Sequence, residues 1–399
     1  MIKVAILGYG TVGSGVYDVI VRNQDIVSKK AGQEIEVAYV LDLRDFPGDP
    51  AENVLVHDFE EILKDDEVKI VIETMGGVEP ANTFIRKAIN AGKSVCTSNK
   101  ELVAKYGSEI FEEARKNKVT FLYEASVGGG IPVLRAMNEA LTADHFDKIT
   151  GILNGTTNYI LTRMDKEGAA FDAVLKDAQD KGYAERKPEA DIEGFDACRK
   201  IAILASLMTG NFVDYEDIST EGITKITGND FKWAASAGMS IKLLGIAKQD
   251  DDKFFALVAP FMVKKEDALY GVNGVYNAVL LHGDMLEDVM FYGQGAGKHA
   301  TASAVVSDVV ELAQNIGKCL DYGWAPEKKT LNDVDEYETP MFVRIKSSDT
   351  FSLPAGAVKI EGENAPEGEI AFVTDVMKKS ELMKLLGNEE VLQIIRVNR

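Results

Sequence analysis

The stretch Lys3-Val4-Ala5-Ile6-Leu7-Gly8-Tyr9-Gly10-Thr11-Val12-Gly13 decides the fold of this chain. Its first five residues form a short apolar run that predicts a buried strand, and a helical pattern follows the glycines. The pattern G-x-G-x-x-G between strand and helix allows a tight turn, the close approach of a pyrophosphate and a favourable helix dipole. We therefore expect a dinucleotide, NAD or NADP, to bind at Gly8, Gly10, Thr11, Val12 and Gly13.

The strand predicted at Glu36–Leu41 ends at residues that affect cofactor choice. A carboxylate at this place hydrogen-bonds the adenosine ribose and favours NAD, whereas a nearby arginine favours NADP. The chain carries both, as Asp42 and Arg44, so the sequence leaves the preference open.

Alternating strand and helix patterns continue after this point. Lys69–Glu73 and Ser94–Thr97 read as strands with a predicted helix at Ala81–Ala91 between them, which is typical of a Rossmann-type, doubly wound α/β sheet. Lys100 begins a helix directly after a strand, at the sheet edge where such folds bind ligands. We expect Lys100 to reach a nicotinamide or a reacting oxygen, and an ordinary solvated lysine is the alternative interpretation.

A glycine-rich segment, Ser126–Pro132, follows a further strand expected at Val119–Ala125. Glycines there let backbone carbonyls converge, so the segment could hold a monovalent cation. From spacing alone, a hinge into the next domain is the favoured interpretation.

The stretch Tyr183–Lys200 carries the residues best suited to chemistry. Asp191 is expected to cap a helix on which Asp196 and Lys200, four residues apart, share a face. Glu185 lies on the loop before it. The apolar residues expected to bury this face near a core are Phe195, Cys198, Ile201, Ala202 and Ala205. An exposed salt bridge beside a charged loop is the alternative interpretation.

The chain divides into three predicted parts. Residues 1–131, completed by a helix at 298–320, form the dinucleotide-binding domain. Residues 132–297 form an α+β substrate and dimerisation domain, which holds a polar turn at Asn154–Tyr159 and strands near Phe254–Phe261 and Ala268–Leu281. Residues 340–399 form a small α+β tail, whose predicted elements are strands Met341–Ile345, Ala357–Ile360, Glu369–Val373 and Val391–Val397 and helix Ser380–Leu386.

Composition limits the classes of partner and the compartment. The 399 residues carry a net charge of −20, which repels nucleic acid and anionic membranes, and no apolar run is long enough to span a bilayer. The three cysteines show no framework spacing, and the first strand leaves no room for a signal peptide, so we expect a cytoplasmic protein. Long apolar strands at 250–281 would be exposed in a monomer, so a homodimer or homotetramer is expected.

These residues together resemble the homoserine dehydrogenase family over essentially the first 320 positions. The motifs that carry the resemblance are Gly8–Gly13, Ser98–Lys100, Glu124–Pro132, Ile152–Ile160 and Gly182–Lys200. The resemblance implies NAD(P)-dependent interconversion of L-homoserine and L-aspartate 4-semialdehyde, a step of threonine and methionine biosynthesis. The alternative is a non-catalytic sensor of dinucleotide and amino acid, which would need the glycine turn but not the Glu185–Lys200 constellation.

The resemblance also implies roles for single residues. It places Lys200 and Lys100 in catalysis, with Lys100 between cofactor and substrate. The implied substrate-binding residues are Glu185, Asp196, Asp191, Thr156 and Tyr183, and Arg44, Gly182 and Gly295 join the cofactor site. Glu124, Val127, Gly129 and Ile131 are implied to hold sodium or potassium, mostly through carbonyls, which reverses the preference for a hinge.

Two departures from the family pattern stand out. Lys187 replaces an acidic residue usual in the loop after Glu185. The tail resembles an ACT domain that has lost its first helix, since only Ser347–Gly356 joins its first two strands.

Overall fold

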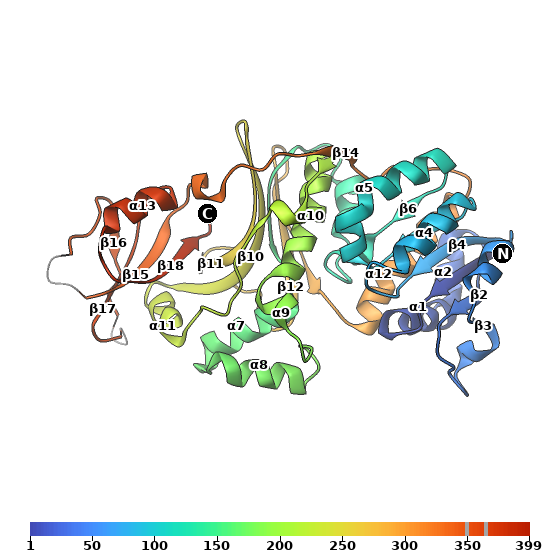
Figure 1. Cartoon of the computed structure of the whole chain (residues 1–399), viewed down its shortest axis with the longest axis horizontal. Coiled ribbons are helices and arrows are strands. Elements are labelled where there is room, and N and C mark those ends of the chain that lie inside the picture. The colour runs from blue at the N-terminus through green and yellow to red at the C-terminus, as the bar shows by residue number, and fades with distance from the viewer. Residues whose placement is uncertain (348–350, 363–365) are drawn as a thin grey trace. The chain divides into compact units, whose positions relative to one another are not determined.

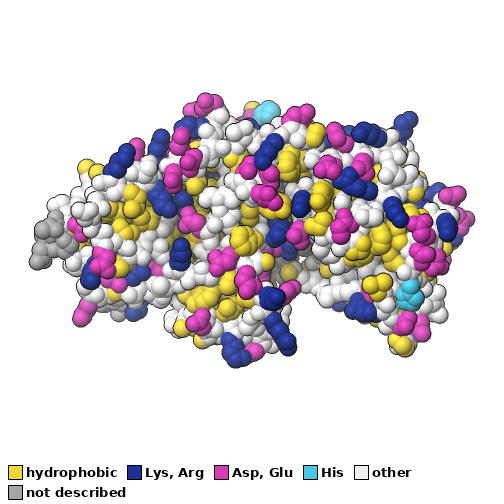
Figure 2. Space-filling view, in the orientation of Figure 1, with side chains coloured by type: hydrophobic (Ala, Val, Ile, Leu, Met, Phe, Trp, Pro, Cys, Tyr) yellow, Lys and Arg dark blue, Asp and Glu magenta, His cyan; other side chains and the backbone are white. Residues whose placement is uncertain are grey.

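A computed structural model describes residues 1–347, 351–362 and 366–399 (Figure 1). Within them the chain forms two compact units. The first comprises Met1–Asp144, Ala202–Tyr215 and Gly293–Lys329, and the second comprises His145–Ile201, Glu216–Tyr292 and Thr330–Arg399. Helix α10 (Phe195–Thr209) contributes residues to both. The face seen in Figure 2 carries acidic and basic side chains interspersed.

The first unit contains a parallel six-stranded sheet in the order β3-β2-β1-β4-β5-β6. Its strands are β1 (Ile2–Leu7), β2 (Ile35–Leu41), β3 (Leu55–Val56), β4 (Val68–Glu73), β5 (Ser94–Thr97) and β6 (Phe121–Leu122). This strand order is that of a Rossmann sheet, so the predicted fold class is confirmed. Strand β6 is shorter than the expected Val119–Ala125, because Glu124 turns away and gives its N–H to the Asp308 carboxylate at 3.0 Å.

Helices cover the first sheet: α1 (Thr11–Arg22), α2 (Gln24–Ala31), α3 (Phe59–Lys64), α4 (Ala81–Asn90), α5 (Lys100–Asn117) and α12 (Lys298–Gln314). Helix α12 comes from the far end of the sequence. Its buried Val305, Val309 and Leu312 pack in one apolar core with Val4 and Val16 of β1 and α1. The dinucleotide-binding fold is thus built from two distant stretches of the chain.

The second unit is organised around a mixed sheet in the order β13-β12-β7-β10-β11-β18-β15-β17-β16, with β9 (Ser219–Thr220) pairing with β11. Its strands are β7 (Phe146–Ile152), β10 (Met239–Asp250), β11 (Lys253–Lys264), β12 (Tyr276–Gly283), β13 (Glu287–Gln294), β15 (Met341–Lys346), β16 (Val358–Lys359), β17 (Glu369–Val373) and β18 (Val391–Val397). Its helices are α7 (Gly155–Glu167), α8 (Phe171–Asp180), α9 (Glu189–Ile192), the start of α10, α11 (Gly228–Ser236) and α13 (Lys379–Leu386). A short pair, β8 (Asn211–Phe212) with β14 (Ala325–Lys328), belongs to the first unit.

Two expectations about 250–281 are wrong. The single strand expected at Ala268–Leu281 begins only at Tyr276, because the preceding turns fold against α7, where Asn158 Nδ2 donates to the carbonyls of Val272 (3.3 Å) and Tyr276 (3.0 Å). The second error concerns the edges of strand β11, which were expected to be exposed in a monomer. Within this one chain β10 pairs with one edge of β11 and β18 pairs with the other.

The tail strands extend the second sheet, because β18 pairs in parallel with β11. Their order, β18-β15-β17-β16, with α13 between β17 and β18, is compatible with a ferredoxin-like arrangement. The connection Ser347–Gly356, expected in place of a first helix, lies partly outside the described residues. A separate ACT-like domain at 340–399 remains a proposal.

Candidate active site

The glycine turn joins β1 to α1 as expected. Gly8 has a φ of +90°, which favours glycine, and a Cβ on Gly13 would lie 1.9 Å from the Gly8 carbonyl oxygen. Around Gly10, in contrast, a Cβ would meet no atom within 4 Å. Gly10 precedes α1, and no side chain of Gly10 caps the first N–H groups of this helix, which form the positive end of its dipole. This cradle fits the pyrophosphate of a dinucleotide.

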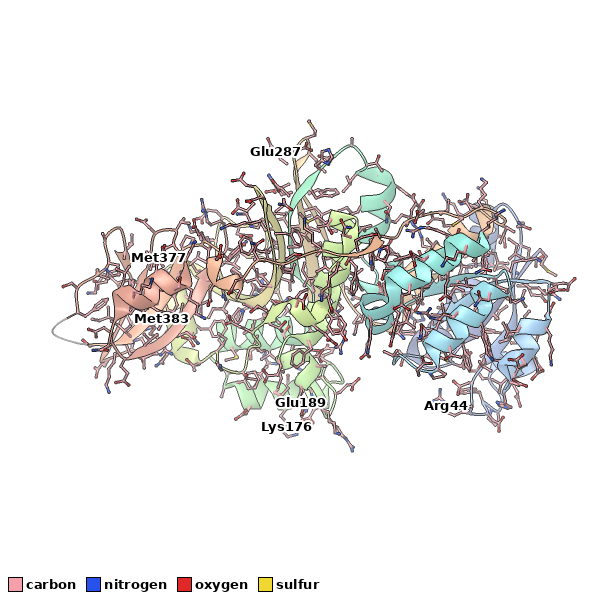
Figure 3. The ribbon with its side chains drawn as sticks, turned by 45° about the horizontal axis from the view of Figure 1, so that its top comes forward. Arg44, Lys176, Glu189, Glu287, Met377 and Met383 are labelled. Atoms are coloured by element: carbon pink, nitrogen blue, oxygen red, sulfur yellow. The ribbon has the colours of Figure 1, made fainter. Side chains whose placement is uncertain are left out.

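Asp42 and Arg44 follow β2 and bind each other. The Arg44 guanidinium donates from Nε to Asp42 Oδ1 at 2.9 Å and from Nη2 to Oδ2 at 3.0 Å. Asp42 Oδ2 also accepts the N–H of Tyr9 in the glycine turn at 2.8 Å. The hydrogen bonds from these donors, of which those from the Arg44 side chain have the largest effect, hold the pKa of Asp42 well below its usual range. The carboxylate expected to favour NAD is therefore tied to the arginine expected to favour NADP, and Arg44 lies on the outside of the first unit (Figure 3).

Lys100 is the first residue of α5 and is partly buried. Asn99 caps this helix, since its Oδ1 accepts the N–H of Leu102 at 3.1 Å. The cap fixes the point at which the chain leaves β5 and enters α5, which is the ligand-binding edge of the sheet.

Lys200 and Asp196 form a buried ion pair in the second unit. Their side chains are 10% and 6% exposed, and Lys200 Nζ donates to Asp196 Oδ2 at 2.7 Å. Nζ also donates to the Leu153 carbonyl at 2.7 Å. Taking both charges out of water is costly, and the cost is offset only by such close partners. The surface salt-bridge interpretation is therefore wrong.

Asn154 is a site residue that we did not predict. Its Nδ2 donates to Asp191 Oδ1 at 2.7 Å and to Asp196 Oδ2 at 2.8 Å, while its Oδ1 accepts the N–H of Thr157 and caps α7. One amide thus orients both carboxylates. The only signal for Asn154 in the sequence is its place before a predicted helix, within the motif Ile152–Ile160.

Two details of this cluster differ from expectation. Asp191 lies within α9 rather than at the residue before α10, because the chain makes an extra short turn before Gly194, whose φ is +86°. Phe195 is 49% exposed and does not join the apolar face, whereas Cys198 and Ile201 are buried. Phe195 is the first residue of α10, where the helix surface is not yet covered.

The loop before α9 carries the remaining substrate-binding candidates. Thr156 Oγ1 donates to the Tyr183 carbonyl at 2.6 Å, which fixes the loop to the start of α7. Gly182 has a φ of +75°, and both Gly182 and Glu185 are exposed. The Glu185 carbonyl accepts Gln179 Nε2 of α8 at 3.0 Å, which ties this loop to the end of that helix.

The candidate cation loop lies in the first unit. Gly128 and Gly129 have φ values of +72° and +56°, and a Cβ on Gly129 would lie 2.5 Å from the Gly295 carbonyl oxygen. The buried Glu124 carboxylate accepts the N–H groups of Leu134 and Arg135, and burial raises its pKa to about 7. The donor set, one carboxylate with the carbonyls of Val127, Gly129 and Ile131, suits a hard cation. Among the described residues no group of three or more His, Cys, Asp or Glu side chains could hold a metal ion. The ligands expected here are mostly backbone carbonyls.

The predicted site residues are thus divided between the units. The first holds the glycine turn, Arg44, Lys100, Gly295 and the cation loop, and the second holds Thr156, Gly182–Glu185, Asp191, Asp196 and Lys200. Within the second unit the structure brings Asp191, Asp196 and Lys200 together through Asn154.

Comparisons with known proteins agree on one family. The family model for homoserine dehydrogenase matches residues 132–310, and the model for the homoserine dehydrogenase NAD binding domain matches residues 8–124. Homoserine dehydrogenase of Bacillus subtilis is 42% identical over 99% of this chain and 96% of its own length. That of Synechocystis is 46% identical over 78% of this chain and 73% of its own length. The structure of a homoserine dehydrogenase from Thiobacillus denitrificans matches with a TM-score of 0.88 at 33% identity, covering 100% of this chain and 98% of that one.

Proposed function

The chain belongs to the homoserine dehydrogenase family, and from this premise we propose how its own residues carry out the reaction. It is an NAD(P)-dependent oxidoreductase that interconverts L-homoserine and L-aspartate 4-semialdehyde, and the predicted family is confirmed. The sensor alternative is not favoured. The observation that carries the proposed mechanism is the cluster in which Asn154 links the partly buried Asp191 to the buried Asp196–Lys200 pair. A sensor would not need this cluster.

A dinucleotide whose pyrophosphate lies at the glycine turn would supply hydride transfer to and from the carbon that carries the substrate oxygen. The protein must then hold the amino acid and move one proton at that oxygen. Asp191 and Asp196 supply carboxylates for the substrate ammonium, and Glu185 adds a third from its exposed loop. Thr156 holds the loop in place at Tyr183, beside the start of α7.

We assign the proton to Lys200. In the direction of reduction, its ammonium gives a proton to the oxygen as the alcohol forms; in the direction of oxidation, the neutral amine takes the proton back. The Leu153 carbonyl and Asp196 Oδ2 fix the position of Nζ for this transfer. Lys100 is proposed to contact both cofactor and substrate.

The test of the proposed function is oxidation of L-homoserine by the purified chain, followed by the absorbance of the reduced nicotinamide with NAD and with NADP. Formation of reduced cofactor that depends on homoserine supports the proposal. Dinucleotide binding without turnover of homoserine would support the sensor instead.

We propose that Arg44 recognises the 2′-phosphate of NADP. Arg44→Ala should lower kcat/KM for NADP by on the order of tenfold or more, because a charge-assisted contact is lost, and should change kcat/KM for NAD far less. The ratio of the two kcat/KM values is the measurement. An equal change with both cofactors would mean that Arg44 only holds Asp42.

The Glu124–Ile131 loop is proposed to hold sodium or potassium. If it does, replacing small alkali cations by tetramethylammonium at constant ionic strength should lower activity several-fold, because a bulky organic cation cannot enter a ring of carbonyls. Titration of sodium back into the same assay should restore the rate. If activity does not change when the cations are exchanged, the loop does not hold a cation that the reaction needs, and the hinge interpretation is favoured.

Assembly and location also belong to this proposal. We propose a homodimer or homotetramer in the cytoplasm. Support for an oligomer comes from β13, which lies at the edge of the second sheet and has two exposed apolar side chains, Met290 (38% exposed) and Tyr292 (52% exposed). No described helix has the length and apolar character required to span a bilayer. Partners other than the small-molecule substrate, such as nucleic acid, are not expected.

A further inference from the structure

A fully buried carboxylate lies at the end of β4 in the first unit. Glu73 Oε1 accepts the N–H of Met75 at 2.7 Å, and Oε2 accepts the hydroxyl of Thr97. Met75 belongs to the turn that follows β4, and Thr97 is the last residue of β5. Burial raises the pKa of Glu73, and the donors from Thr97 and Met75 oppose this effect. One side chain therefore joins the turn after β4 to the last residue of β5, at the carboxyl edge of the sheet.

The contacts continue from Thr97 to the residue before Lys100. Thr97 Oγ1 accepts the N–H of Asn99 at 2.9 Å, so the hydroxyl proton of Thr97 is directed at Glu73. Asn99 in turn caps α5 through Leu102 and donates from Nδ2 to the Gly77 carbonyl at 2.5 Å. The start of α5, and with it the backbone of Lys100, is fixed by this chain of bonds.

The turn after β4 also touches the glycine turn. Thr74 Oγ1 donates to the Gly8 carbonyl at 2.9 Å, and Thr74 N–H donates to the Leu7 carbonyl at 2.9 Å. A Cβ on Gly8 would lie 2.8 Å from Met75 Cγ. Glu73 thus lies between the dinucleotide turn on one side and the lysine-bearing helix on the other.

We infer that Glu73, Thr97 and Asn99 are positioning residues that fix Lys100 relative to the dinucleotide turn. The inference rests on the proposed role of Lys100. The physical basis of this inference is that Lys100 has a long side chain. The position that its ammonium group can reach therefore depends on where the backbone of Lys100, the first residue of α5, is held. A displacement of about 1 Å at a reacting group can lower the rate by up to about 100-fold. A rigid, buried anchor at Glu73 prevents that displacement.

Thr97→Val tests the network, because it keeps the shape of the side chain and removes the hydroxyl that links Glu73 to Asn99. We expect kcat to fall by on the order of tenfold. The dissociation constant of NADP, measured by fluorescence titration, should rise by a smaller factor, because Lys100 is only one of the residues proposed to contact the cofactor. Thr97→Ser restores the hydroxyl and should recover most of kcat.

Thr120→Val is the matched control. Thr120 is equally buried, bonds the Lys318 carbonyl and the Leu320 N–H, and precedes β6 at the opposite, amino edge of the sheet. It should lower the melting temperature about as much as Thr97→Val without lowering kcat. A similar fall in kcat for both variants would overturn the inference, since general destabilisation would then explain it.

A double-mutant cycle with Lys100→Ala completes the test. If the network acts through Lys100, Thr97→Val should lower kcat little further in the Lys100→Ala background. Equal factors in both backgrounds overturn the inference, as does a wild-type rate in Lys100→Ala alone. Failure of the proposed function would be seen earlier, as absence of homoserine oxidation by the unmodified chain.

Discussion

Lys200→Ala should lower kcat by on the order of 10²–10⁴, the usual contribution of a positioned acid or base. Lys200 is fixed by the Leu153 carbonyl and by Asp196, and its burial keeps water from replacing it easily. Affinity for the dinucleotide should barely change, because Lys200 belongs to the second unit and the glycine turn to the first. Steady-state kinetics and a cofactor titration measure both quantities.

The variant must be separated from simple loss of fold. Lys200→Ala leaves Asp196 buried without its cation, which typically lowers the free energy of unfolding by about 3–5 kcal/mol, so assays belong well below its melting temperature. Lys176→Ala is the matched control, since Lys176 and Asp180 form an i,i+4 pair on α8 with 74% and 65% of their side chains exposed (Figure 3). It should leave kcat unchanged. If Lys200→Ala keeps kcat and only raises KM, Lys200 binds substrate and the proton passes to Lys100 or water.

Local patterns predicted most of the first unit. The glycine turn, the strand Ser94–Thr97 and the alternation of strand and helix depend on neighbouring residues, and the structure confirms them. The tail strands Glu369–Val373 and Val391–Val397 also match to the residue. Ala268–Leu281 failed for a tertiary reason, because its apolar residues continue through turns that α7 holds in place.

The site was predictable in its charges but not in its connections. Asp196 and Lys200 were found because four residues along a helix define a face. The role of Asn154 depends on partners 37 and 42 residues away, which no local pattern encodes. Glu73 was missed for a similar reason: a single acid at the end of an apolar strand gives no sign of the hydroxyl that meets it from the next strand.

The structure also predicts that two glycines of the same turn respond differently to substitution. A Cβ on Gly10 meets no atom within 4 Å, and its φ of −84° is one that any residue adopts. Gly10→Val should therefore fold with an unchanged melting temperature, yet abolish dinucleotide binding, because the new side chain fills the space where the pyrophosphate approaches the helix.

Gly13→Val is the contrasting variant, since its Cβ would lie 1.9 Å from the Gly8 carbonyl oxygen and 2.7 Å from Thr74 Oγ1. It should lower the melting temperature as well as binding, because the turn itself cannot form around a side chain. Thermal unfolding and fluorescence titration with NADPH separate the two effects. Unchanged affinity in Gly10→Val would remove the glycine turn from the cofactor site. A fall in melting temperature as large as that of Gly13→Val would mean that Gly10 is needed for folding, as Gly13 is, and that its loss of binding says nothing about the pyrophosphate.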